Sequence, residues 1–129
     1  SIMANGTIAF DTLTTSDQAN TGTEKSIDTS YIFNGVAKVW QQAQGDSTVT
    51  DSFNVSSMTD NGTGTFTTNF ANAMVNAFYS GLSTGASGDH LISSVGNTQS
   101  GQCRFDHYNQ SNASVNTGLH CVGILGDLA

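Results

Sequence analysis

From Val36 onward, short segments of β-branched, aromatic and hydroxyl residues are separated by turns rich in Asn, Asp and Gly. Such segments suit strands, and Asn and Gly supply the positive φ angles of tight turns. A helical bundle is disfavoured because Ala, Leu, Glu, Lys and Arg, the strong helix formers, are scarce. We therefore expect an all-β fold, an antiparallel β-sandwich of about seven strands with an extended N-terminal arm.

The clearest turn signal is Asn61-Gly62, which favours a two-residue type I′ hairpin. That turn would pair Phe53 with Phe70 and place both on one face with Val55 and Phe66. Seven strands are expected at residues 36–44, 53–59, 65–70, 78–83, 91–95, 102–108 and 117–125, with a helical turn or a loop at 71–77.

Residues 1–35 differ from the rest of the chain and are treated as a separate assembly segment, with the sandwich domain at 36–129. Ile8, Phe10 and Leu13 give one short amphipathic piece, and residues 14–30 are almost entirely polar. Such a segment cannot cover a core. We expect an arm that is ordered by contact with another molecule, and a flexible terminus is the alternative.

Charge and hydropathy exclude two classes of partner. The net charge is −7 with three Lys and Arg residues, so little is available to neutralise phosphates, and nucleic acid is not an expected partner. Apolar runs are too short for a membrane span. The first residues, SIMANGTIAF, lack the basic start and apolar segment of a secretory signal. We expect either that a signal was removed or that the protein is made in a cytoplasm.

The two cysteines sit symmetrically about a turn-rich segment. A hairpin centred on Asn112 would place Cys103 opposite Cys121, at a spacing compatible with a disulfide. Two reduced, buried thiols are the alternative. In the same register Arg104, Asp106 and His120 share the other face, as a polar cluster at a subunit contact or as a solvated face.

Signals for catalysis are weak, and we expect no enzyme activity. Residues 81–85 match G-x-S-x-G, but the residues that follow read as a loop instead of the helix that a nucleophile elbow needs. His90, His107 and His120 lack metal-ligand spacing, and His107 and His120 fall on opposite faces of the expected hairpin. No metal or other cofactor is expected. Trp40 and Tyr108 are candidate surface-contact aromatics, with core or interface roles as the alternative.

One stretch of sequence has a recognisable form. It runs through residues 34–40 (NGVAKVW), residues 54–64 (NVSSMTDNGTG) and a return strand ending in Asn69-Phe70, followed by Ala73-Met74. This pattern resembles a module of tail-fibre-like virion-surface proteins of bacteriophages, many of them marine. The resemblance covers residues 34–80 and carries over no catalytic or receptor-binding residue.

The resemblance implies a β-rich virion protein that forms a homotrimer and is made in the bacterial host cytoplasm. Such a module would contact other virion proteins through residues 1–35 and a host-surface glycan or protein through the sandwich. The chain is shorter than usual for these proteins, which keeps a capsid cement or decoration protein as an alternative. A carbohydrate-binding module is the third expectation.

Overall fold

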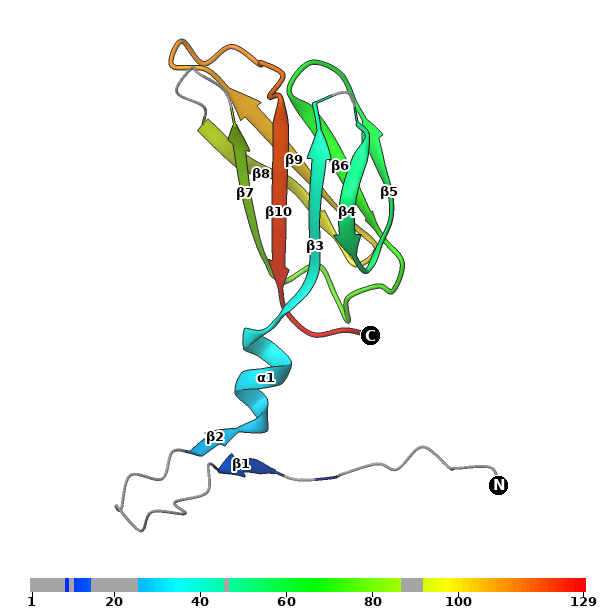
Figure 1. Cartoon of the computed structure of the whole chain (residues 1–129), viewed down its shortest axis with the longest axis vertical. Coiled ribbons are helices and arrows are strands. Elements are labelled where there is room, and N and C mark those ends of the chain that lie inside the picture. Colours follow the sequence, from blue (N-terminus) through cyan, green and yellow to red (C-terminus); the bar gives the residue numbers. More distant parts are fainter. Residues whose placement is uncertain (1–8, 10, 15–25, 46, 87–91) are drawn as a thin grey trace.

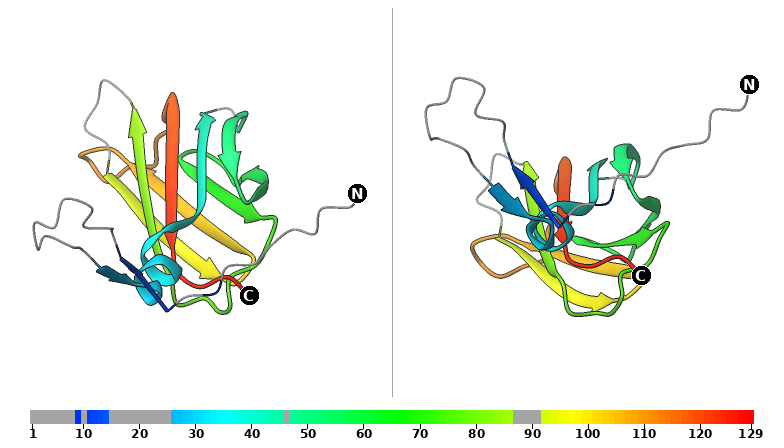
Figure 2. Two further views of the ribbon diagram at one scale, coloured as in Figure 1. Left: turned by 60° about the horizontal axis from the view of Figure 1, so that its bottom comes forward. Right: turned by 90° about the horizontal axis from the view of Figure 1, so that it is seen from below.

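The computed structural model describes residues 9, 11–14, 26–45, 47–86 and 92–129. Its main body is a pair of four-stranded antiparallel sheets, with strand orders β4-β3-β10-β7 and β5-β6-β9-β8 (Figure 1). Views from other directions show the two sheets as separate layers (Figure 2). The predicted antiparallel all-β sandwich is confirmed.

The strands follow the expected segments closely in some places and depart from them in others. Both β6 and β9 have the predicted bounds, whereas residues 49–53 form a separate strand that was not predicted. The elements are β1 (Thr12–Thr14), β2 (Ser26–Asp28), α1 (Thr29–Gly35), β3 (Ala37–Gln44), β4 (Val49–Phe53), β5 (Val55–Asp60), β6 (Thr65–Phe70), β7 (Ser80–Ala86), β8 (Ile92–Gln99), β9 (Gln102–Tyr108) and β10 (Leu119–Leu125).

Part of the N-terminal arm has regular structure. Strands β1 and β2 pair in a small ribbon, and α1 follows directly. The Asp28 carboxylate caps this helix by accepting a hydrogen bond from the Ser30 backbone N–H at 2.8 Å. At the other end, Lys38 Nζ donates to the carbonyl oxygens of Ile32 and Val36. Arm residues 1–8, 10 and 15–25 lie outside the described residues.

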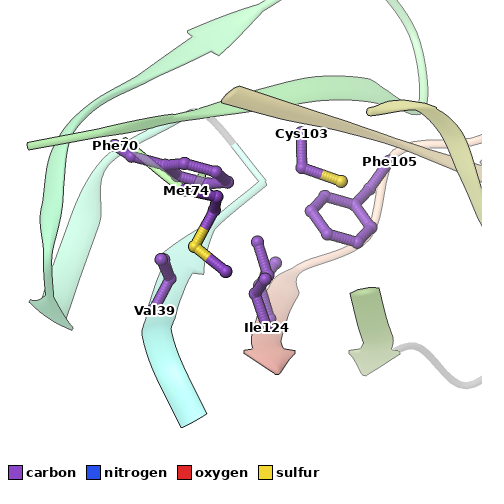
Figure 3. Close-up of a cluster of buried hydrophobic side chains, with 7 residues drawn as sticks. Val39, Phe70, Met74, Cys103, Phe105 and Ile124 are labelled. Atoms are coloured by element: carbon purple, nitrogen blue, oxygen red, sulfur yellow. The ribbon is translucent and has the colours of Figure 1, made fainter. Parts of the chain in front are cut away.

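Residue alternation decides which side chains enter the space between the sheets. In β3 every second residue is buried, beginning with Val39, and in β10 the buried set begins with His120. The apolar part of this interior contains Val39, Phe70, Met74, Cys103, Phe105, Val122 and Ile124 (Figure 3). Met74 comes from the segment between β6 and β7, where a bridge to Leu128 holds it in place. These side chains supply the main hydrophobic stabilisation, at roughly 1.5–3 kcal/mol each.

The predicted register of the β5–β6 hairpin is wrong. Val55 pairs with Phe70 and Asp60 pairs with Phe66, and residues 61–64 connect the two strands. The two-residue turn does not form because the chain reversal extends to Gly64, which has a positive φ of 70°, as Gly62 also has a positive φ. Gly64 lies against the backbone of Val115, where a larger residue would not fit. Phe53 belongs to β4 in the other sheet, where it pairs with Trp40.

The predicted hairpin between the two cysteine strands is also wrong. Strand β9 pairs with β6 and β8, whereas β10 pairs with β3 and β7 in the other sheet. Residues 109–118 therefore cross from one layer to the other. Asn112 does turn the chain, at φ 60°, but it closes a small loop in which the Asn109 N–H donates to the Ala113 carbonyl. Local turn chemistry was recognised, but the strands on either side take other partners.

Candidate functional site

A row of exposed apolar side chains crosses the outer face of the β4-β3-β10-β7 sheet. The pairings Phe53–Trp40, Trp40–Gly123 and Gly123–Leu82 place these four residues side by side on adjacent strands. Phe53, Trp40 and Leu82 are 55%, 41% and 58% exposed. Gly123 has no side chain, and no described atom lies within 4 Å of the place where a Cβ would stand. The row is thus interrupted between Trp40 and Leu82 by open space.

That open space forms part of a shallow groove of about 450 Å³. Its lining comes from two neighbouring strands: Leu82, Ser83, Thr84, Cys121, Val122 and Gly123. The next outward-facing row is polar and runs Asp51, Gln42, Cys121 and Thr84. The outer face therefore carries an apolar row beside a row that holds a carboxylate, an amide and a hydroxyl. Surfaces of this mixed kind suit contact with another macromolecule.

The two aromatic residues singled out in the sequence are not neighbours. Trp40 lies on this outer face, as a contact residue should, but Tyr108 is half-buried at the end of β9 in the other sheet. Phe53 and Leu82 take the places beside Trp40 instead. Sequence reasoning missed them because it assigned Phe53 to the wrong hairpin and did not separate β4 from β5.

The outer face of the β5-β6-β9-β8 sheet is mostly polar, with the exposed side chain of Ile92 at its edge. Arg104 Nε lies 3.3 Å from Asp106 Oδ1, and the pair packs directly over Gly96, where a Cβ would meet the Asp106 carboxylate. Asn69 Nδ2 donates to the hydroxyls of Ser57 and Thr59, each at 3.0 Å. Arg104 and Asp106 share a face as predicted. His120 does not join them, because its strand lies in the opposite sheet.

His107 and His120 meet inside the sandwich instead of facing apart. His107 Nε2 lies 2.7 Å from His120 Nδ1, and both side chains are fully buried. At the other side of the first ring, His107 Nδ1 lies 2.8 Å from the Ser93 hydroxyl. His120 Nε2 has no hydrogen-bond partner among the described residues. A Ser–His–His chain therefore links β8 and β9 of one sheet to β10 of the other.

Burial favours the neutral form of both rings. It lowers the pKa of His120 to about 4, and the neighbouring His107 lowers this pKa further in the same direction. Burial also lowers the pKa of His107, against a smaller opposing effect of the Asp106 carboxylate. A neutral His107 is able to accept the Ser93 proton in a hydrogen bond. The sequence contained a signal for the burial of His120, which alternates with the apolar residues Val122 and Ile124.

The two cysteines are free and point in different directions. Cys103 is buried in the apolar interior, whereas Cys121 lines the outer groove. Burial raises the pKa of the Cys103 thiol to about 11, and a hydrogen bond with Tyr79 opposes this shift. Tyr79 is fixed in turn by the carbonyl oxygens of Gln99 and Gln102, at 2.9 and 2.7 Å from its hydroxyl.

The G-x-S-x-G match lies within strand β7 and makes no nucleophile elbow in the described residues. Its serine, Ser83, pairs with Val122 of β10 in regular antiparallel register. The third histidine of the chain, His90, lies outside the described residues. Among the residues that the structure describes, no three His, Cys, Asp or Glu side chains gather in a way that would hold a metal ion.

A second groove, of about 600 Å³, lies where α1 meets the sandwich. Its lining comes from the helix and from the chain segments next to it: Ser30, Phe33, Asn34, Lys38, Val75, Asp127 and Leu128. On this helix Tyr31 and Phe33 are 69% and 65% exposed. The arm thus presents apolar side chains of its own beside the sandwich.

Comparisons with known proteins give no relative. Neither a family model, a curated protein nor a solved structure matches this chain. Within the described part of the chain, no helix has the length and hydropathy needed to cross a membrane.

Proposed function

We propose that this protein is a non-enzymatic structural component of a bacteriophage virion, a homotrimeric module of the tail-fibre kind that contacts the host surface. The observation that carries the proposal is the apolar row of Phe53, Trp40 and Leu82 on one outer face. Exposed apolar side chains gathered on one face mark interaction sites on soluble proteins. The sequence resemblance at residues 34–80 supplies the virion context.

In this proposal the outer face of the β4-β3-β10-β7 sheet is the interface between copies. Burial of Trp40, Phe53 and Leu82 supplies the association energy, and the groove over Gly123 receives an apolar side chain of a neighbouring copy. The polar face of the other sheet stays in solvent. Weak contacts with a host-surface glycan or protein are then multiplied by the number of copies on the particle.

The interface is tested by light scattering coupled to size exclusion. The wild-type protein should show about three times the chain mass of 13.4 kDa. The double substitution Trp40→Ser, Leu82→Ser should reduce this to one chain mass. Ile92→Ser is the matched control, because Ile92 is 54% exposed but lies on the other sheet, and it should leave the trimer intact. A wild-type monomer at high concentration contradicts the proposal.

A capsid cement or decoration protein is the second candidate. It is favoured by the arm, whose helix exposes Tyr31 and Phe33 beside a groove at the sandwich. Copy number in purified particles separates the two functions. A small number of copies confined to the tail favours the fibre module, and copies distributed over the head favour decoration. Absence from particles contradicts both.

A further inference from the structure

The Ser93–His107–His120 chain is a polar connection between the two sheets, near the end where residues 109–118 cross from one sheet to the other. His107 lies on β9 and His120 on β10, so their 2.7 Å contact joins the two layers directly. The ring planes are nearly perpendicular, at 85°, with centroids 4.9 Å apart. One ring therefore donates an N–H···N hydrogen bond to the other, and the tautomers of the two rings decide which one donates.

Aromatic and neutral groups surround the pair. The Phe66 ring of β6 lies 5.4 Å from His120, and the Phe105 ring of β9 lies 5.9 Å from it, centroid to centroid. Strand β3 presents Ala43 beside His120, and β7 presents Gly85. Ser93 faces His107 from β8. Asp106 is the charged group with an effect on the pair, from the outer side of β9, where it is paired with Arg104.

Such a pair takes up a proton only by placing a charge in the buried interior while the sheets stay together. In the neutral state one ring donates and the other accepts. If His120 donates to His107, an added proton on His120 Nε2 creates a cation with no acceptor among the described residues. If His107 donates, His120 Nε2 already carries the proton of the neutral ring, and an added proton on His107 Nδ1 meets the Ser93 hydroxyl, which then has to accept instead of donate. A proton on the accepting nitrogen would set two donors against each other across 2.7 Å. Either way, separation of β9 from β10 lets water solvate the charge.

We propose that the His107–His120 pair holds the two sheets together at neutral pH, and that protonation of the pair in mildly acidic solution separates the sheets at this end of the sandwich. The released end is the one where residues 109–118 cross from β9 to β10 (Figure 1). That crossing is attached beside the pair, since the Val115 N–H donates to the His107 carbonyl and Asn116 Oδ1 accepts from the Gly64 N–H. Opening would therefore free the crossing as well.

The sign of the pH effect follows from linkage. A histidine whose pKa is lowered in the closed state binds a proton more tightly once the sheets open. Stability is therefore complete above the ordinary histidine pKa of 6.5 and falls as the pH decreases toward about 4, the pKa of His120 in the closed state. In that window each such histidine reduces the closed-to-open ratio by roughly tenfold per pH unit.

Hydrogen exchange at pH 7.5 and pH 5.0, corrected for intrinsic exchange rates, tests the release on the full chain. Amides of His107, Val115 and His120 should lose at least tenfold more protection than those of Phe70 and Ile124. Equal loss at both sets, or no loss at pH 5.0, overturns the proposal. This measurement needs no substitution and does not depend on the oligomeric interface.

Variants then assign the effect to the pair. His107→Leu, His120→Leu replaces both rings with apolar side chains and should remove the difference in protection between pH 7.5 and 5.0. His90→Gln is the matched control and should keep it. If the double variant does not fold, His120→Gln replaces it and should reduce the pH dependence by about tenfold per pH unit between pH 6 and pH 5. An unchanged pH dependence in the folded variant contradicts the proposal.

Discussion

The interior of this sandwich contains two different groups of side chains. The apolar group (Val39, Phe70, Met74, Cys103, Phe105, Val122 and Ile124) is continuous and close-packed. The polar group (Gln41, Thr68, His107, Thr117 and His120) is equally buried, and all of its members except Thr68 make a side-chain hydrogen bond. In the polar group Gln41 Oε1, Thr68 Oγ1 and His120 Nε2 have no hydrogen-bond partner among the described residues.

The difference teaches that burial alone does not measure stabilisation. An apolar side chain contributes in proportion to the surface it removes from water. A buried polar side chain contributes only when its partners are supplied, and an unpaired atom reduces stability by about 1–3 kcal/mol. We therefore expect the apolar group to provide most of the folding energy. We expect the histidine pair of the polar group to make the stability of one end of the sandwich depend on pH.

Truncation in the apolar group should have the largest effect. Ile124 is fully buried between the sheets, so Ile124→Ala removes contacts and leaves a cavity. We expect the free energy of unfolding to fall by about 3–4 kcal/mol, measured by urea denaturation. Ile92→Ala is the control, because Ile92 is 54% exposed on the other sheet, and it should change the stability by less than about 0.5 kcal/mol. Comparable losses at the two sites would contradict the description of the apolar group.

The sequence predicts the strands better than it predicts their partners. Alternation and turn residues are local, and they located β6 and β9 to the residue. Pairing is decided by contacts between distant segments, and there the local signals were misleading. The Asn61-Gly62 signal was correct for a turn but wrong for the register, because Gly64 lengthens the connection. The symmetry of Cys103 and Cys121 about Asn112 had no structural meaning.

The candidate site was predicted only in part for the same reason. Trp40 was identified as a surface aromatic, and its exposure follows from the alternation in β3. Its neighbours Phe53 and Leu82 come from two other strands, and only the sheet order brings them together. The histidine pair spans two sheets, so no local pattern on one strand would have shown the contact between His107 and His120.

Backbone approach at the histidine end gives the second prediction. Gly64 has φ 70°, and a Cβ there would lie 2.6 Å from the Val115 carbonyl oxygen and 2.7 Å from that of His107. Gly64→Ala should therefore reduce the stability by about 2–3 kcal/mol, through backbone strain and displacement of the crossing. Gly101→Ala is the control, because no described atom lies within 4 Å of its Cβ position, and its effect should stay within about 0.5 kcal/mol. Thermal unfolding monitored by circular dichroism measures both, and equal effects would exclude this close approach.

The smallest effect has the opposite sign and separates the two interior groups most sharply. Thr68 is fully buried, and its hydroxyl has no partner among the described residues. Thr68→Val keeps the shape of the side chain and removes the unpaired oxygen, so it should raise the free energy of unfolding by about 1 kcal/mol. Thr117 provides the matched comparison, because its buried hydroxyl donates to the Leu119 carbonyl at 2.6 Å.

Thr117→Val should instead lower the free energy of unfolding by about 1 kcal/mol, since the Leu119 carbonyl loses its donor. Urea denaturation of the two variants side by side measures both signs. If Thr68→Val destabilises the protein as much as Thr117→Val does, then Thr68 is hydrogen-bonded in solution. Gln41 Oε1 and His120 Nε2 would then be the remaining atoms of the polar group without a partner among the described residues.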